Sequence, residues 1–321
     1  MIVVTGAAGF IGSCILARLN ELGREDILIV DHLDNELKPK NLKNKKFIDY
    51  FDKKDFLKHV KEKQMSSDVD CIIHMGACSS TLLTDEKYYN ENNFEYTKIL
   101  AQWALKNNVR FIYASSAATY GDGAKGYSDD HAFIKTYKPL NFYGQSKQDF
   151  DQWALDEGVL DKMVGLKFFN VFGPNEYHKG SMRSLVLKAY KKVNEEGKML
   201  LFKSYKKEYA HGEQKRDFIY IKDAVDVVMY FFENLSLSGI YNVGTGEAQT
   251  WNKLALALFK AAGKESHIEY IEMPLELRDQ YQYFTQADMS KLRSAGYQKS
   301  FRGLEESVLD YAEYLLRKDY I

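Results

Sequence analysis

Short hydrophobic runs alternate with longer amphipathic stretches through the first half of the chain. Continuous apolar runs of strand length are typical of strands buried in a parallel sheet, whereas apolar residues at i, i+3 and i+4 mark one face of a helix. Strands that alternate with crossover helices form βαβ units. The pattern predicts an α/β fold with a doubly wound parallel sheet, with strands at Ile2–Thr5, Ile27–Val30, Cys71–Met75, Arg110–Ala114 and Met163–Phe168 and helices near 10–22, 52–63, 86–107 and 144–157.

The second half has a different pattern, in which helical periodicity mixes with short strands such as "DFIYI" and "GIYNVG". The stretch 203–216 ("KSYKKEYAHGEQKR") is charged and aromatic, which predicts a loop. We expect residues 1–170 to form the larger domain, with later segments returning to it, and residues 171–321 to form most of a smaller mixed α/β C-terminal lobe. The helices predicted in this half are 181–195, 222–233, 250–262 and 303–318.

Charge and cysteine content exclude several classes of partner. The 321 residues carry 44 Lys plus Arg against 45 Asp plus Glu, a net charge of −1. Nucleic acid and anionic membranes usually select for a basic surplus, so neither is expected as a partner. Cys14, Cys71 and Cys78 lack the spacing of a metal site and lie in apolar segments, which indicates reduced thiols. Since no apolar run reaches the ~20 residues needed to span a bilayer, the sequence predicts a cytoplasmic protein without a metal.

The run "VVTGAAGFIG" places Gly6, Gly9 and Gly12 directly after the first predicted strand and at the start of a helix. Glycines there allow a tight turn, a close approach of the backbone to a pyrophosphate, and close packing of the helix on the strand. The helix N-terminus adds free N–H groups and the positive end of a dipole. Asp31, at the end of the second strand, is placed to bind an adenosine ribose. Together these residues predict a dinucleotide-binding, Rossmann-type sheet.

Two lysines leave the choice of dinucleotide open. Asp31 would hydrogen-bond a ribose 2′-hydroxyl, which favours NAD. Lys38 and Lys53 could neutralise a 2′-phosphate and admit NADP, although spacing alone favours a solvated surface for both lysines.

A candidate proton-transfer set lies further along the chain. "FIYASSAATYG" ends a strand with Ser115 and Ser116, and "YGQSK" puts Tyr143 and Lys147 four residues apart, on one helix face. A phenol has a pKa near 10, so the use of Tyr143 as a base near neutral pH requires a shift of about 3 units, or roughly 4 kcal/mol. Lys147 and an oxidised nicotinamide could supply the positive charge, and a serine hydroxyl could bind the substrate oxygen.

Two other polar residues have plainer interpretations. His74, at a strand end, is interpreted as structural or close to the cofactor rather than as a metal ligand. Arg216, in "KRDFIYI", could bind a substrate diphosphate through two N–H groups. Taken alone, however, an arginine in this setting is more often an ordinary cation.

The glycine spacing and the Ser/Tyr/Lys set are similar to those of the extended short-chain dehydrogenase/reductase family, whose members move a hydride between a sugar or alcohol carbon and a nicotinamide. The resemblance narrows through "HMGACSST", "NNFEYTK", "YASSAATYG", "NFYGQSK", "FFNVFGP", "HKGSM", "KRDFIY", "NVGTG", "YQYFTQAD" and "LRSAGY". In this order, over nearly the whole chain, they resemble the epimerases that invert C-6 of an ADP-linked heptose for the lipopolysaccharide inner core. Such an enzyme would oxidise the sugar transiently with a tightly bound NADP and return the hydride to the opposite face.

The resemblance also implies a homo-oligomer larger than a dimer, with a pentamer as the candidate form, an ADP-heptose substrate, and roles for single residues. Tyr143 would be one acid/base, with Ser116 and Lys147 completing the catalytic set. The implied cofactor contacts are Gly6, Gly9, Phe10, Ile11, Gly12, Asp31, His32, Lys38, Lys53, Met75, Gly76, Ala77, Cys78, Ser79, Asn92, Lys147, Val171 and Lys179. The implied substrate contacts are Ser79, Asn170, Ser181, Lys188, Leu201, Phe202, Lys203, Ser204, Arg216 and Tyr281.

The chain departs from the family pattern at two positions beside the cofactor. His32 stands where an asparagine is expected, and Met75 stands where an acidic residue is expected. The resemblance favours Lys38 and Lys53 as 2′-phosphate partners, and NAD stays open beside NADP.

Lys179, in "HKGSM", is the second acid/base that the resemblance implies. A second group is needed because return of the hydride to the other face presents the C-6 oxygen in an orientation that Tyr143 serves poorly. Apolar residues repeat at helical spacing from Met182 to Val193, so Ser181 is expected to cap a helix and Lys179 to precede its N-terminus. The positive end of the helix dipole would then lower the pKa of Lys179.

Two other functions stay open from the sequence. Another NAD(P)-dependent nucleotide-sugar epimerase or a dehydratase would share the fold, although dehydratases generally need an acidic group beside the catalytic serine, and "SSAATYG" has none. A non-catalytic dinucleotide-binding protein would be favoured by loss of Tyr143 or Lys147, and both are present.

Overall fold

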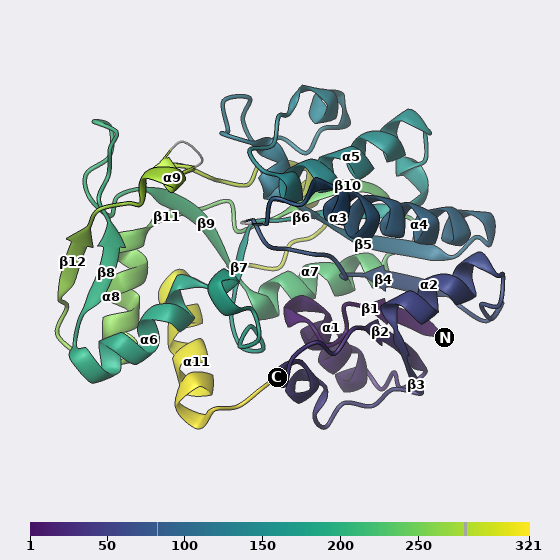
Figure 1. Ribbon diagram of the computed structural model, residues 1–321, viewed down its shortest axis with the longest axis horizontal. Coiled ribbons are helices and arrows are strands. Elements are labelled where there is room, and N and C mark those ends of the chain that lie inside the picture. The colour runs from purple at the N-terminus through teal and green to yellow at the C-terminus, as the bar shows by residue number, and fades with distance from the viewer. Residues whose placement is uncertain (82, 279–280) are drawn as a thin grey trace.

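A parallel sheet forms the larger lobe of the computed structural model, which describes residues 1–81, 83–278 and 281–321 (Figure 1). Within those ranges the sheet has seven strands, each paired in parallel with its neighbour. Its inner strands are buried, as expected where helices cover both faces. From one edge to the other the strands are β10 (Gly239–Val243), β6 (Val164–Phe168), β5 (Arg110–Ser116), β4 (Cys71–His74), β1 (Ile2–Thr5), β2 (Ile27–Asp31) and β3 (Asp49–Asp52).

Helices cover both faces of this sheet (Figure 1). Successive strand residues point to opposite faces, so Val4 packs in one hydrophobic core and Val3 in the other. Helices α1 and α7 lie over the first core, and α2, α4 and α5 lie over the second. The predicted doubly wound α/β fold is confirmed. The helices are α1 (Phe10–Glu21), α2 (Lys53–Lys61), α3 (Glu86–Tyr89), α4 (Tyr96–Lys106), α5 (Phe142–Asp156) and α7 (Ile221–Glu233), with a π-helical segment (Asn90–Glu95) between α3 and α4.

The smaller lobe is a mixed α/β unit at the left of Figure 1. In it β9 pairs antiparallel with β11 and parallel with β7, and β12 pairs parallel with β8. Helices α6, α8 and α11 pack against one another. The strands are β7 (Asn170–Phe172), β8 (Met199–Phe202), β9 (Lys215–Tyr220), β11 (Ala248–Thr250) and β12 (Ile268–Ile271), and the helices are α6 (Leu185–Glu196), α8 (Trp251–Ala261), α9 (Leu275–Arg278) and α11 (Leu304–Arg317). The short helix α10 (Ser290–Ser294) returns to the larger lobe and packs against β10.

The expected helix start at Ser181 is wrong. Residues Gly180–Met182 form a separate 3-10 turn, and Arg183 is extended, with φ −61° and ψ 151°. The N-cap of α6 is Ser184, whose side chain accepts a hydrogen bond from the Leu187 N–H at 3.3 Å. The predicted loop 203–216 also ends earlier, because β9 begins at Lys215. The domain boundary near residue 170 stays a prediction.

Candidate active site

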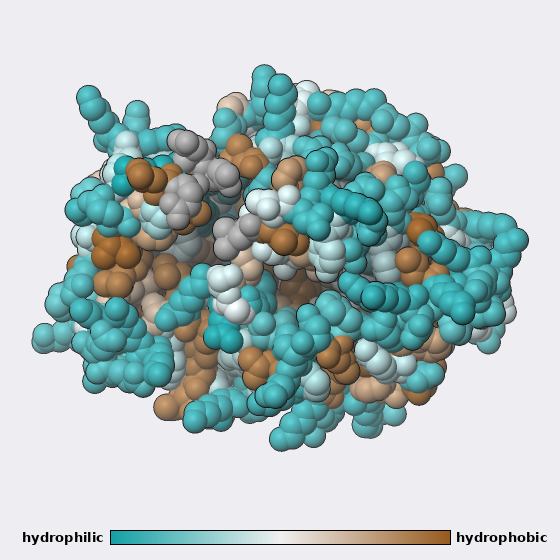
Figure 2. Space-filling view, viewed as in Figure 1, coloured by the Kyte–Doolittle hydropathy of each residue, from teal (hydrophilic) through white to brown (hydrophobic). Residues whose placement is uncertain are grey.

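A cleft of about 1090 Å³ lies between the two lobes, at the carboxyl ends of the sheet strands, where open α/β sheets bind their ligands. Figure 2 shows a mostly hydrophilic surface that is hollowed near its centre, where hydrophobic residues are visible in depth. The cleft is lined by most of the residues that the sequence singled out, namely Gly6, Gly9, Phe10, Ile11, Gly12, Asp31, His32, Lys38, Lys53, Met75, Gly76, Ala77, Cys78, Ser79, Asn92, Ser116, Tyr143, Lys147, Asn170, Val171, Lys179, Lys188, Leu201, Phe202, Arg216 and Tyr281.

Three residues expected to bind substrate are not part of this lining. Ser181 is exposed on the 3-10 turn. Lys203 forms an ion pair with Glu272 at 2.7 Å, and Ser204 Oγ donates to a carbonyl of its own loop at 3.0 Å. Contacts outside the cleft therefore engage Lys203 and Ser204.

The glycine turn has the shape that a dinucleotide pyrophosphate requires. Gly6 has φ +66°, a conformation that favours glycine. A Cβ on Gly12 would lie 2.1 Å from the Gly6 carbonyl oxygen, and one on Gly6 would lie 2.7 Å from the Gly76 nitrogen. The N-cap of α1 is Gly9, which brings no capping side chain, so the N–H groups of the first turn are available to a ligand. The residues present therefore fit a dinucleotide.

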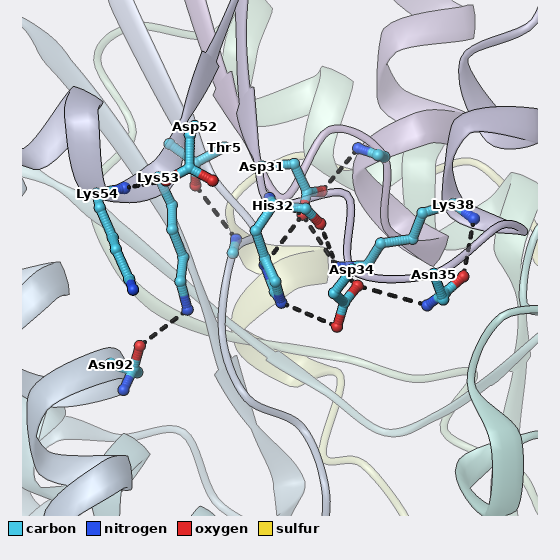
Figure 3. Close-up of polar contacts among 12 residues, drawn as sticks. Thr5, Asp31, His32, Asp34, Asn35, Lys38, Asp52, Lys53, Lys54 and Asn92 are labelled. Carbon is cyan, nitrogen blue, oxygen red and sulfur yellow. Dashed lines mark hydrogen bonds and ion pairs between the residues drawn. The ribbon is translucent and has the colours of Figure 1, made fainter.

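Asp31 is held at the far end of the cleft by backbone and charge (Figure 3). Its carboxylate accepts from the Ala8 N–H at 2.8 Å and from the His32 N–H at 2.7 Å, and it pairs with Lys38 at 3.1 Å. Burial alone would raise the pKa of Asp31, but the hydrogen bonding of His32 and the charge of Lys38 outweigh it and hold that pKa below its usual value. Asp31 is therefore an ionised acceptor suited to a ribose hydroxyl.

Positive charge is concentrated beside Asp31. Lys53 Nζ donates to Asn92 Oδ1 at 2.9 Å, and burial together with the charge of Lys38 lowers the pKa of Lys53. Burial and the charges of Lys38 and Lys179 lower the pKa of His178 to about 4. The lysine charges gathered here are suited to a multiply charged anion such as a phosphate.

The proton-transfer set lies where β5 and α5 meet. Ser116 Oγ accepts from the Ala118 N–H at 3.1 Å, and Tyr143 lies in the first turn of α5, which Asn141 caps. Burial raises the pKa of Tyr143, and a hydrogen bond with Ser116 lowers it less, so the net shift is upward. This direction is opposite to the one expected from the sequence, because burial outweighs the Ser116 hydrogen bond. Lys147 Nζ donates to a backbone carbonyl of β5 at 2.7 Å, and burial lowers its pKa to about 8.

A buried ion pair beneath this set was missed by sequence reasoning. Asp151, 0% exposed, pairs with Lys167, 1% exposed, at 2.5 Å. The same carboxylate accepts from Ser115 Oγ at 2.7 Å and from the Tyr113 hydroxyl at 2.9 Å. Ser115 and Ser116 both line the cleft, but the Ser115 hydroxyl is engaged by the Asp151 carboxylate, in a network that fixes α5 on the sheet. The available signal was the repeat of four residues from Tyr143 through Lys147 to Asp151, which places all three on one helix face.

Lys179 lines the cleft from the loop that precedes α6. Its ammonium lies 5.3 Å from the centre of the Phe10 ring. Burial lowers the pKa of Lys179; the charge of Glu176 opposes this shift and that of Lys188 adds to it. The expected direction is present, but its cause differs, because a 3-10 turn, not the start of α6, follows Lys179.

Buried side chains hold the Lys179 loop in place. Glu176 accepts from the Ser184 N–H at 2.6 Å and from the Tyr311 hydroxyl at 3.0 Å. Asn41 Nδ2 donates to the Ala8 carbonyl at 2.9 Å and to the Asn175 carbonyl at 3.0 Å, which ties this loop to the glycine turn.

Arg216 lines the cleft from the smaller lobe, on β9. It is 6% exposed, and its guanidinium lies 5.1 Å from the Tyr281 ring centre and 5.7 Å from that of Trp251. Trp251 Nε1 donates to the Tyr281 hydroxyl at 2.8 Å. Arg216 Nη1 donates to the Lys215 carbonyl at 2.8 Å. No carboxylate pairs with Arg216 among the described residues, so its remaining N–H donors are suited to a phosphate. Trp251 was missed because a single tryptophan carries no spacing signal.

His74 is structural, as expected. Its ring contacts Thr5 Oγ1 at 2.6 Å and Thr97 Oγ1 at 2.9 Å, and burial lowers its pKa to about 3. Across the described part of the chain, no group of three or more His, Cys, Asp or Glu side chains is arranged to hold a metal. Nor does any helix within those ranges have the length and apolar character needed to cross a bilayer.

Comparison with known proteins gives the family. Residues 2–244 match the NAD dependent epimerase/dehydratase family. This chain belongs to that family. An ADP-L-glycero-D-manno-heptose-6-epimerase from Nitratidesulfovibrio vulgaris is 51% identical to this chain over 320 residues. Another from Fusobacterium nucleatum is 46% identical over 328 residues, and each match covers 99% of both chains. The crystal structure of the Helicobacter pylori ADP-L-glycero-D-manno-heptose-6-epimerase is similar with a TM-score of 0.83 at 27% identity, over 98% of this chain and 96% of that one.

Membership of the NAD dependent epimerase/dehydratase family agrees with the cleft. The chain is an enzyme of the epimerase type, and its cofactor is a nicotinamide dinucleotide. The glycine turn and Asp31, the residues typical of dinucleotide sites, line the same cleft.

Proposed function

We propose that this chain is an isomerase that inverts C-6 of ADP-D-glycero-D-manno-heptose to give ADP-L-glycero-D-manno-heptose, in the synthesis of lipopolysaccharide inner-core precursors. Relatives that bear this name match the whole chain at up to 51% identity. The observation that carries the proposal is that one cleft is lined by two candidate acid/base groups, Tyr143 and Lys179. Inversion through a transient ketone requires proton transfer at the same oxygen in two orientations.

NADP is the proposed cofactor. Lys38 and Lys53 line the adenosine end of the cleft, and the charge of Lys38 contributes to the lowered pKa of Lys53. A 2′-phosphate would relieve this repulsion and would gain charge-assisted hydrogen bonds. NAD would leave the repulsion in place.

A nicotinamide dinucleotide held by the glycine turn and Asp31 would supply the hydride acceptor at C-6 of the sugar and the hydride for the opposite face. Tyr143 takes the proton of the C-6 hydroxyl as general base, and Ser116 hydrogen-bonds the same oxygen. Lys147 is mostly protonated at pH 7, since its pKa is about 8, and its charge favours the phenolate of Tyr143. The helix N-terminus that carries Tyr143 acts in the same direction.

Lys179, in its protonated form, donates a proton to the C-6 oxygen as the hydride returns, and proton exchange with solvent then resets Tyr143 and Lys179. The oxygen then lies in a second orientation, and a lysine whose pKa burial has lowered is a better acid/base near neutral pH than an exposed one. Arg216 binds the substrate diphosphate, with Tyr281 and Trp251 holding its guanidinium plane. A dehydratase would require an acidic group after Ser116, where Ala117 and Ala118 line the cleft.

The proposed function is tested by incubating the purified protein with ADP-D-glycero-D-manno-heptose and following the C-6 configuration by NMR. Inversion is expected; a substrate that keeps its configuration while the cofactor is bound would overturn the proposal. The cofactor is released from the protein and identified by mass, and NAD alone would overturn the NADP assignment.

Lys179→Met tests the second acid/base. The variant is expected to keep its fold and its cofactor and to lose epimerisation, by roughly 10²–10⁴-fold if Lys179 supplies general catalysis. Lys191→Met is the matched control, because Lys191 lies on α6 with a side chain 80% exposed. Wild-type turnover in Lys179→Met would refute the role.

A further inference from the structure

Lys38 is saturated by its protein partners. Within the described ranges its ammonium lies 3.1 Å from the Asp31 carboxylate, 3.0 Å from the His32 carbonyl and 3.2 Å from the Asp34 carboxylate. Figure 3 shows these residues gathered at the end of β2 and in the segment that follows it. An ammonium has three N–H donors, so the three partners use its full capacity. A phosphate that binds Lys38 must therefore replace one of them.

Asp34 is the partner that is most easily replaced. Asp31 is buried and is fixed by two backbone N–H groups, and the contact from His32 is a backbone carbonyl. The Asp34 side chain, by contrast, is 52% exposed and is free to turn toward solvent. Asp34 also contacts His32, the other basic side chain close to Lys38, because Asp34 Oδ2 lies 3.1 Å from His32 Nε2.

Asp34 is ionised at neutral pH. Burial raises the pKa of this carboxyl, but attraction to Lys38 outweighs burial and holds the pKa below its usual value. A dinucleotide with a 2′-hydroxyl leaves the contacts of Asp34 intact. A 2′-phosphate either expels Asp34 from Lys38 and His32 or lies beside a like charge, and both carry a cost.

We infer that Asp34 is a specificity-determining residue that competes with a ribose 2′-phosphate for Lys38 and His32, and so narrows the preference for NADP over NAD. The inference rests on the proposed use of NADP. It assigns to Asp34 a role opposite to that of Lys38, since removal of its charge strengthens phosphate binding. The two carboxylates also neutralise Lys38 until a phosphate arrives.

The experiment is calorimetric titration of the 321-residue chain, freed of nucleotide, with adenosine 2′,5′-bisphosphate and with adenosine 5′-monophosphate. Asp34→Asn keeps the shape of the side chain and removes its charge. Glu36→Gln is the matched control, since it makes the same charge change at an exposed position of the same loop. Asp34→Asn is expected to bind the bisphosphate roughly tenfold more tightly, with affinity for the monophosphate unchanged.

Each arm of this experiment decides a separate point. If both ligands tighten equally in Asp34→Asn, or if neither changes, or if Glu36→Gln has the same effect, the role of Asp34 is refuted. If the wild type binds the bisphosphate no better than the monophosphate, the proposed NADP preference fails. The variant still tests Asp34 in that case, because a selective gain for the bisphosphate shows the competition directly. The ratio of NADP to NAD that copurifies, measured by mass, is expected to rise in Asp34→Asn.

Discussion

Replacement of Lys167 by methionine tests the buried pair that anchors the catalytic helix. The substitution leaves the Asp151 carboxylate 0% exposed, with hydrogen bonds from Tyr113 and Ser115 but without a counter-charge. Breaking a buried pair in this way costs about 3–5 kcal/mol of unfolding free energy. For a chain of 321 residues, the usual entropy of unfolding per residue converts that loss to a fall in Tm of roughly 4–7 °C.

The assay is thermal unfolding followed by circular dichroism at pH 7. Lys135→Met is the control, because Lys135 pairs with Asp156 at the surface, with side chains 61% and 56% exposed, and its Tm is expected to change by less than about 1 °C. Asp151→Asn combined with Lys167→Met removes the stranded charge and keeps an acceptor oxygen, so it is expected to recover at least half of the loss. A single Lys167→Met variant as stable as the Lys135→Met control would refute the reasoning.

Three further predictions concern single groups. Gly12→Val puts a Cβ 2.1 Å from the Gly6 carbonyl, so dinucleotide affinity measured by calorimetry should fall more than tenfold; unchanged affinity would contradict the packing argument. Arg216→Lys cannot make two parallel bonds to a diphosphate, so ADP, titrated as a competitor of the reaction, should bind roughly tenfold more weakly, and equal affinity would exclude bidentate binding. Burial raises the pKa of Asp129 to about 6, so this group stabilises the fold fully below the unfolded pKa of 3.8 and loses that contribution as pH rises through 6. The stability of wild type relative to Asp129→Asn, from urea unfolding, should therefore fall by up to about 3 kcal/mol between pH 4 and pH 7, and a flat difference would show that Asp129 does not titrate in this way.

The sequence was most informative where a function depends on neighbours in the chain. The glycine turn is recognised from three glycines, Gly6, Gly9 and Gly12, in one short segment of the chain. Tyr143 and Lys147 are four residues apart, so any helix brings them to the same face. Both were therefore predicted, together with Asp31 at the end of the second strand. Most contacts implied by family resemblance also line the cleft, because matching motifs fix the same strand ends.

The sequence was least informative where distant segments determine the outcome. Lys167 pairs with Asp151 across α5 and β6, and neither residue lies in a motif. Ser181 was taken as a helix cap because its spacing suited one; the structure uses Ser184, whose N–H and hydroxyl are both held by Glu176. The direction of the pKa shift at Tyr143 depended on burial, which a motif does not report.

The position of β10 at the edge of the sheet has a consequence for folding during synthesis on the ribosome. β10 (Gly239–Val243) pairs with β6 (Val164–Phe168), and the two are ~70 residues apart in the chain. At 5–20 residues/s, a ribosome takes roughly 4–14 s to make the intervening segment. Throughout that interval β6 presents an open, apolar edge of the kind that recruits other chains. Chaperone binding to nascent chains is therefore expected to peak between the emergence of these two strands.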